Sequence, residues 1–195
     1  MSTQAFRPWT PSPELLRHVQ ELAFQQTLSA DAQAYVESAL TKGPSRAVQS
    51  RRGNVITQFY SPKMKTSIKL ESRTGEFPMA ARLESDSDVL AYMAQPPRVS
   101  LTLLNEHGKA TTTTPYTPDF LVVRTDRIEV IETRDDGELS RRSLDNPYQF
   151  YKDDSGQWHY RGAEEHFARL GFTYRLVANS QHPAVLIENE RFLED

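Results

Sequence analysis

The chain has no cysteine among its 195 residues, no long apolar run and no strong net charge. Without cysteine the protein cannot form disulfides, thiolate zinc sites or a cysteine nucleophile, so any metal must be held by oxygen or histidine. The five histidines show no metal-ligand spacing, and we interpret them as surface or helix-face residues. Since no run approaches membrane-spanning length and the first residues lack a signal-peptide stretch, we expect a soluble, cytoplasmic protein with no membrane partner.

Charge is distributed unevenly, although the formal net charge is only -3. From Lys42 to Arg73 the sequence has eight basic residues against one acid, Glu71. Two interpretations are open, because such a segment either lies along a phosphate backbone or forms a solvated basic face without a partner. The residues that we single out as candidate DNA contacts are Arg51, Arg52, Lys63, Lys65, Lys69 and Arg73.

The first part of the sequence predicts two helices. Ser12 followed by proline is typical of an N-cap, and apolar residues mark one face of a helix over residues 14–28. A second helix is expected over residues 31–40. We interpret residues 1–45 as a small N-terminal helical appendage that packs on a main domain, residues 46–195, or on a partner.

The main domain shows alternating strand and helix patterns. A helix with Glu76 in its first turn is expected after an extended basic segment, and a polar, irregular stretch to about residue 160 is expected after the third strand. The strand candidates are residues 99–104, 117–124, 127–133 and 172–177, and a further helix covers residues 162–170. This order indicates a mixed α/β fold. Gln95 is interpreted as a structural residue in the turn before the first core strand.

Two acidic residues are expected to face each other across a hairpin. If Thr125 and Asp126 make a two-residue turn, the register sets Asp119 directly opposite Glu132. Like charges at opposed positions destabilise a sheet pair, so the arrangement requires a cation. Either a divalent metal or Arg134 supplies that charge.

Glu76 would add a third acidic oxygen to this pair. Hard divalent cations such as Mg²⁺ take oxygen ligands, and the backbone carbonyl of Thr133 could complete the site. Strand alternation puts Arg134 on the same face as Glu132, where its charge could stabilise a reacting phosphate. Another interpretation is an unrelated α/β domain in which Glu132 and Arg134 form an ordinary ion pair.

These residues carry a specific resemblance. Pro118-Asp119 followed by Glu132-Thr133-Arg134 resembles the motif of the PD-(D/E)xK nuclease superfamily. Within that superfamily, an ordered set of short pieces is similar to TnsA, the endonuclease subunit of heteromeric transposases. The pieces are residues 59–64, 71–72, 76–77, 88–89, 95–96 and 116–120. The resemblance covers the chain from about residue 46 to its end.

The resemblance implies a restriction-endonuclease-like core, in which a central mixed sheet is flanked by helices. It carries the family's metal-binding glutamate to Glu76, its motif aspartate to Asp119 and its strand acid to Glu132. The family lysine falls on Arg134, which is a departure, because arginine stays protonated and cannot act as a base. The implied activity is cleavage of double-stranded DNA at transposon 5′ ends with Mg²⁺, or Mn²⁺ in its place.

The same resemblance implies partners. In the family a TnsB-like DDE transposase acts at the 3′ ends and a TnsC-like ATPase regulator joins the two subunits, so the protein would be nucleoid-associated when bound to DNA. Some relatives fuse nuclease and transposase, and residues 187–195 look like the junction of such fusions. The chain is then either a minimal form or one domain of a longer protein. An alternative is a catalytically impaired subunit for DNA binding and transpososome assembly, in which Arg134 neutralises the acids.

Overall fold

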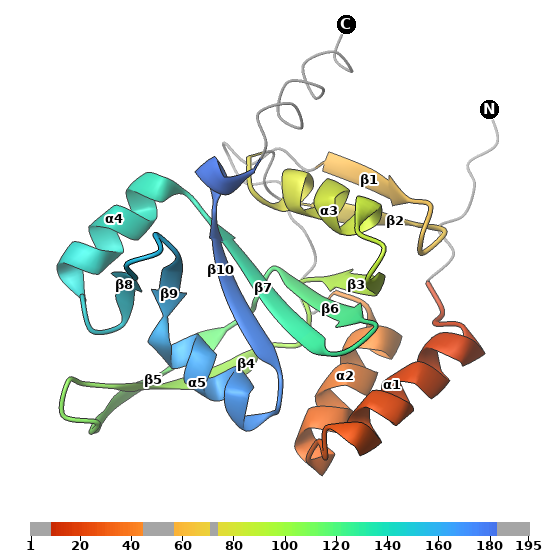
Figure 1. The fold of residues 1–195 in the computed structure, drawn as a ribbon, viewed down its shortest axis with the longest axis horizontal. Helices are drawn as coiled ribbons and strands as arrows, with labels where there is room; N and C mark the ends of the chain where they lie inside the picture. Colours follow the sequence, from red (N-terminus) through yellow and green to blue (C-terminus); the bar gives the residue numbers. More distant parts are fainter. Residues whose placement is uncertain (1–8, 45–56, 71–73, 183–195) are drawn as a thin grey trace, which may run out of the picture.

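The computed structural model describes residues 9–44, 57–70 and 74–182, which form an α/β fold around a mixed sheet (Figure 1). The central sheet has four strands in the order β10, β7, β6, β3. Its members are β3 (Val89–Ala94), β6 (Phe120–Arg124), β7 (Ile128–Arg134) and β10 (Thr173–Ala178). The first three form an antiparallel meander, whereas β10 runs parallel to β7. The predicted mixed α/β class is therefore confirmed.

The two middle strands are buried along nearly their whole length. All five residues of β6 and the first six of β7 are buried, as expected for strands that are covered on both faces. Helix α5 (Arg161–Arg169) packs on β10 and on β4, while α3 (Glu76–Ser85) packs on β3 and on β1. The end of the β6–β7 hairpin that carries the predicted acids thus lies within a packed sheet.

Two N-terminal helices pack on the sheet domain. Helix α1 (Pro13–Gln25) begins after Ser12, whose hydroxyl accepts the predicted capping bond, and is followed by α2 (Ala30–Lys42). The ring of Tyr35 in α2 lies 6.2 Å from that of Phe167, between centroids. Both helices were predicted, with slightly different ends. None of the helices in the described ranges is long and apolar enough to cross a membrane.

Among the described residues, three two-stranded antiparallel ribbons lie around this core. A basic hairpin pairs β1 (Thr57–Ser61) with β2 (Thr66–Leu70), in the segment that was expected to be extended. A second ribbon pairs β4 (Val99–Leu104) with β5 (Ala110–Tyr116), and a third pairs β8 (Phe150–Lys152) with β9 (Trp158–Tyr160). Figure 1 shows β8 and β9 beside α4 (Asp136–Asp145), across β10 from α3.

Two sequence predictions about this region are wrong. Residues 99–104 were expected to form the first core strand, but β4 pairs only with β5 and is mostly half-buried, whereas the buried β3 takes that place. Gln95 therefore follows the first core strand instead of preceding it. Residues 135–160 were expected to be irregular, yet they form α4, β8 and β9. The reason is that α4 is polar and buries only Leu139, while β8 and β9 have only three residues each, so none of them contains an apolar run long enough to indicate an element.

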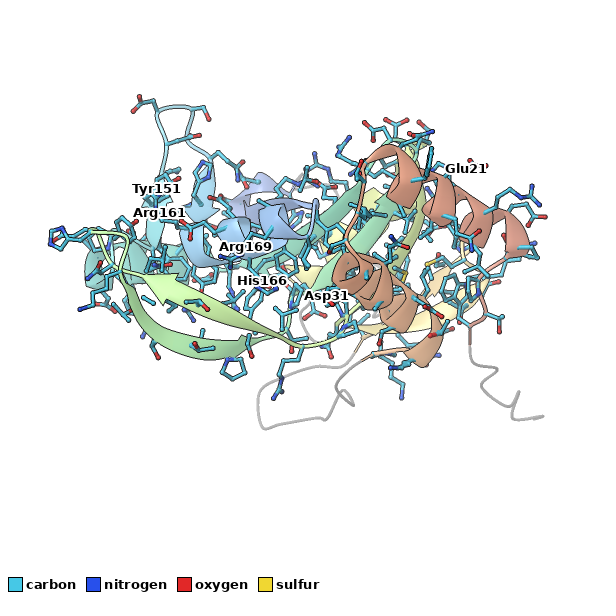
Figure 2. All side chains as sticks on the ribbon, turned by 90° about the horizontal axis from the view of Figure 1, so that it is seen from below. Glu21, Asp31, Tyr151, Arg161, His166 and Arg169 are labelled. Carbon is cyan, nitrogen blue, oxygen red and sulfur yellow. The ribbon has the colours of Figure 1, made fainter. Side chains whose placement is uncertain are left out.

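Aromatic and basic side chains meet between the β8–β9 ribbon and the start of α5. The guanidinium of Arg161 lies 4.7 Å from the ring centroid of Tyr148 and 5.1 Å from that of Tyr151. Figure 2 shows Tyr151 and Arg161 side by side there, with His166 and Arg169 further along α5. These cation–π contacts attach the start of α5 to the ribbon.

Candidate functional site

The β6–β7 hairpin has the predicted register. The amide of Arg124 donates to the carbonyl of Arg127 at 2.9 Å, which closes a two-residue turn at residues 125–126. Phe120 pairs with Ile131 at the other end. One step further along this register, Asp119 lies opposite Glu132, at the end of the hairpin away from the turn. We call these two residues the acid pair.

Thr133 holds the carboxylate of Asp119. Its backbone N–H and its hydroxyl both donate to Asp119 Oδ2, each at 2.7 Å. Two hydrogen bonds to one oxygen fix the orientation of the Asp119 carboxylate. The sequence prediction assigned Thr133 a role through its backbone carbonyl, whereas the observed contacts use its amide and its side chain.

Glu132 is almost entirely buried, with 2% of its surface exposed. The hydroxyl of Tyr116 donates to Glu132 Oε2 at 2.8 Å, and the guanidinium of Arg134 contacts Oε1. Burial first, and the charge of Asp119 second, raise the pKa of Glu132 to about 8 against the opposing effect of Arg134. The acid pair is therefore electrostatically coupled, and its surroundings disfavour two negative charges.

Arg134 points toward the acid pair. It contacts Glu132, and its Nη1 lies 3.5 Å from Oε1 of Glu138, one helical turn further along the chain. Burial acts to lower the pKa of Arg134, but the charges of Glu132 and Asp119 outweigh it and raise that pKa above its usual value. Arg134 is thus a permanent cation beside the pair and cannot act as a proton acceptor.

A cavity of about 220 Å³ opens beside Glu132 and Arg134. Its walls come from β5, β7, α4, the β8–β9 ribbon and β10. Lining residues that matter here are Tyr116, Glu132, Arg134, Arg142, Tyr160 and Tyr174. The hydroxyls of Tyr116 and Tyr174 lie 3.0 Å apart, and burial together with the charge of Glu132 raises both pKa values well above the usual tyrosine range. Both tyrosines therefore stay neutral, and Tyr116 can serve Glu132 as a hydrogen-bond donor.

Glu76 is the first residue of α3 and is buried, with 6% of its surface exposed. The preceding Gly75 packs against Thr133, so the start of α3 lies next to the end of β7 that carries the site. Within residues 9–44, 57–70 and 74–182, no three acidic or histidine side chains are grouped closely enough to hold a metal ion between them. The set of three acids, including Glu76, stays a prediction.

The acid pair by itself has the donors that a divalent cation takes. Both members present carboxylate oxygens, and Mg²⁺ is commonly held by one or two carboxylates while it keeps several waters. Burial and the charge of Asp119 both disfavour a negative charge on Glu132. A divalent cation held by the two carboxylates would offset this, so the acid pair fits such an ion.

The predicted DNA contacts are divided between described and undescribed residues. Arg51, Arg52 and Arg73 lie outside the described residues. Lys63 serves the fold, because its ammonium donates to the carbonyls of Asp86 and Val89, each at 2.6 Å. Lys65 and Lys69 are exposed on the β1–β2 hairpin. Of the described candidates, these two lysines are exposed, and their contact with DNA stays a prediction.

Sequence analysis missed the two tyrosines that surround Glu132. Tyr116 comes from the end of β5, and Tyr174 comes from β10, where Leu176 pairs with Glu132. A signal for Tyr174 exists, because it lies two residues before the partner of Glu132 and so shares its face of the sheet. Tyr116 opens one piece of the motif resemblance, residues 116–120, but its strand belongs to a different sheet, so no strand register places it beside Glu132.

Replacing Gly75 by alanine is expected to lower the free energy of unfolding by roughly 1–3 kcal/mol. A β-carbon there would lie 2.9 Å from Thr133 Oγ1 and 2.9 Å from Asn179 Oδ1. Thr133 is β-branched and bonded to Asp119, so it cannot easily retreat. Urea unfolding measures the effect. The matched control is Gly137→Ala in α4, and equal stability of the two variants would contradict this packing.

Comparisons of the chain with protein-family models and with curated proteins found no match.

Proposed function

We propose that this chain is a divalent-metal-dependent DNA endonuclease of the PD-(D/E)xK type, related to TnsA, that cleaves phosphodiester bonds at transposon 5′ ends. The observation that carries the proposal is the acid pair, Asp119 and Glu132, coupled at one end of the hairpin with the permanent cation of Arg134 beside it. Two carboxylates and one cation, held within a packed sheet, are suited to phosphodiester chemistry.

The fold supports a more specific version of this proposal, which concerns the architecture of the core. Helix α3 is followed by the meander β3, β6 and β7, and α5 then leads to β10, which runs parallel to β7. We propose that these elements are the restriction-endonuclease-like core implied by the motif resemblance. The motif aspartate and the strand acid then belong to neighbouring antiparallel strands, as Asp119 and Glu132 do.

The chain's own residues divide the work of the site. Asp119, oriented by Thr133, and Glu132, held by Tyr116, would bind the cation. When bound, a divalent ion activates water and stabilises charge on the phosphate. Arg134 keeps its proton, so it stabilises negative charge on a phosphate oxygen and takes no proton. Exposed Lys65 and Lys69 would contact the DNA backbone.

One observation favours a second candidate function. The guanidinium of Arg134 already contacts Glu132, as expected of a nuclease-fold subunit whose acid pair is neutralised internally. Such a subunit would bind transposon ends and join a DDE transposase and an ATPase regulator without cleaving DNA. Both candidates would work in the cytoplasm at the nucleoid, and they differ in metal binding.

Calorimetric titration with Mg²⁺ and Mn²⁺ tests the proposed function. The wild type is expected to bind either ion, and Asp119→Ala is expected to weaken binding at least about tenfold, because the pair loses one carboxylate. The matched control is Asp126→Ala, which removes the exposed aspartate at the turn of the same hairpin. If the wild type binds neither ion, the endonuclease proposal is wrong and the assembly subunit is favoured.

A further inference from the structure

Two arginines line the cavity beside the acid pair, and one glutamate joins them. Nη2 of Arg142 lies 2.7 Å from Oε1 of Glu138, and Nε of Arg142 donates to the same oxygen at 2.8 Å. Nη1 of Arg134 lies 3.5 Å from that oxygen. One carboxylate oxygen of Glu138 therefore lies between two guanidinium groups, and both arginines belong to the wall of the same cavity.

The side chain of Arg142 is held in place, although it is 40% exposed. Its guanidinium lies 5.2 Å from the ring centroid of Phe150, and that ring stacks on Tyr160 with 4.3 Å between the centroids. An ion pair on a helix surface normally leaves the arginine free to move, whereas this stack adds a second restraint. The bonds to Glu138 use Nε and Nη2, so Nη1 has no partner among the described residues. Arg142 is thus a fixed cation with N–H donors left for a ligand.

The charges around this cavity favour an anion. Among the described residues that line it, two are arginines and one, Glu132, is an acid. In the proposed site a divalent cation engages Glu132 together with Asp119. The two arginines then share Glu138, so positive charge is left in the cavity wall.

The size and chemistry of the cavity fit a phosphate group. Its volume of about 220 Å³ holds about seven waters at roughly 30 Å³ each, which is below the usual range for drug-sized ligands. Guanidinium groups bind phosphate oxygens with paired N–H donors, and phosphate contacts supply much of the affinity of proteins for DNA. An extruded base fits less well, because the ring of Phe150 already engages Tyr160 and Arg142.

We propose that Arg142 is a DNA-binding residue that, together with Arg134, holds a backbone phosphate in this cavity. The inference deepens the proposed function and rests on its DNA-binding part, which the endonuclease and the assembly subunit share. Because the cavity adjoins Glu132, a phosphate held there fixes the DNA backbone beside the acid pair. The DNA contacts predicted from the sequence all precede α3, whereas Arg142 belongs to α4.

Arg142→Met tests the inference through the affinity for a short fluorescent DNA duplex. Fluorescence anisotropy measures binding in Ca²⁺ at several salt concentrations, and a gel confirms that the duplex stays intact. The variant is expected to bind about tenfold less tightly at low salt, because a charged hydrogen bond to the DNA is lost. The slope of log affinity against log salt is expected to fall by about one, which loss of a purely structural residue would not cause.

Two further variants serve as controls. Arg141→Met removes the neighbouring arginine of α4, which is exposed and does not line the cavity, and it is expected to have a clearly smaller effect. Arg142→Lys keeps the positive charge, so the salt slope should be retained while part of the affinity is lost with the planar fork. Equal losses in Arg141→Met and Arg142→Met would show diffuse attraction and overturn the inference. Wild-type affinity and slope in Arg142→Met would overturn it as well.

The inference and the proposed function fail in different ways. If the wild type binds Mn²⁺ but Arg142→Met binds the duplex as tightly as the wild type does, the cation site stands and the role of Arg142 falls. If the wild type binds the duplex through Arg142 but binds no Mn²⁺, the endonuclease proposal falls and the role of Arg142 stands. If the wild type binds no duplex at any salt concentration, the role of Arg142 falls.

Inorganic phosphate distinguishes DNA from a free phosphate as the source of the anion. If it raises the melting temperature of the wild type and not that of Arg142→Met, while both bind the duplex equally, the cavity takes a free phosphate and the DNA-binding role is wrong. Weakened duplex binding in Arg142→Met, with a reduced salt slope and near-normal binding in Arg141→Met, supports the inference.

Discussion

The wild type is expected to lose stability as the pH rises from about 5 to about 8, and Glu132→Gln is expected to abolish this loss. The folded pKa of Glu132 is about 8, against an ordinary value of 4.5. In this window the folded protein therefore retains a proton that the unfolded chain has released. The free energy of unfolding must then fall as pH rises, by about 1.4 kcal/mol per pKa unit, or roughly 3–5 kcal/mol in all.

Urea unfolding at several pH values between 5 and 9 measures this effect as the difference between wild type and variant. Glutamine keeps the shape of Glu132 and carries no titratable proton, so groups elsewhere that titrate in the same range cancel in the difference. The matched control is Glu106→Gln, an exposed glutamate in the β4–β5 loop. Parallel stability curves for wild type and Glu132→Gln would contradict the raised pKa.

The same unfolding and binding measurements can be repeated with divalent ions present. A cation and a proton compete for the carboxylate of Glu132, so the affinity of the wild type for Mn²⁺ is expected to rise with pH up to about pH 8. Saturating Mn²⁺ should also offset the loss of stability at the alkaline end, because it binds the folded state alone. Glu132→Gln should show neither behaviour.

The hairpin could be predicted from the sequence because local rules determine it. Thr125 and Asp126 form the turn, and alternation along two apolar strands then permits one register. The start of α3 was predictable for a similar reason, since Glu76 opens a segment whose apolar residues recur at helical spacing. Where a short stretch of sequence contains the whole physical cause, the prediction was right.

Predictions were wrong where competition between distant segments decides the structure. Residues 89–94 and 99–104 are both short and apolar, and either could complete an antiparallel meander. The structure uses the first as β3 and pairs the second with β5. Tertiary packing makes this choice, because the central position requires a strand buried on both faces, as β3 largely is.

The chemistry around the acid pair was predictable only in part. Alternation correctly placed Arg134 on the face of Glu132, as their ion pair shows. The hydroxyl of Tyr116 could not be foreseen, because its place depends on how a strand of a separate sheet ends beside the hairpin. The sequence shows which side chains could be hydrogen-bond or ion-pair partners. Which of them come into contact depends on where the strands end in the fold.

Arg134→Met is expected to destabilise the protein strongly. It leaves the buried Glu132 beside Asp119 without its cation, and removing one partner of a buried ion pair is strongly destabilising. Because the side chain of Arg134 is 34% exposed, we expect a loss of roughly 2–4 kcal/mol at pH 8, toward the low end of such cases. The double variant Arg134→Met with Glu132→Gln should regain most of this loss, since no uncompensated charge remains.

Arg142→Met is the matched control for this substitution. Arg142 lines the same cavity, but its side chain is 40% exposed and its ion-pair partner is Glu138, outside the acid pair. Its loss is expected to cost less than about 1 kcal/mol. If Arg134→Met were no less stable than Arg142→Met, the contact between Arg134 and Glu132 would not balance the acid pair.

Plasmid nicking by Arg134→Lys separates the two candidate functions. If Arg134 stabilises charge on the phosphate, the wild type nicks DNA, Arg134→Met loses about 10²–10³-fold in rate, and Arg134→Lys retains most of it. If Arg134 instead neutralises an acid pair that does not bind metal, the wild type is inactive. Nicking then appears only with lysine, which binds carboxylates as a point charge and less firmly than the planar guanidinium. Because both outcomes depend on one side chain, the same variants that measure the stability of the acid pair also decide its function.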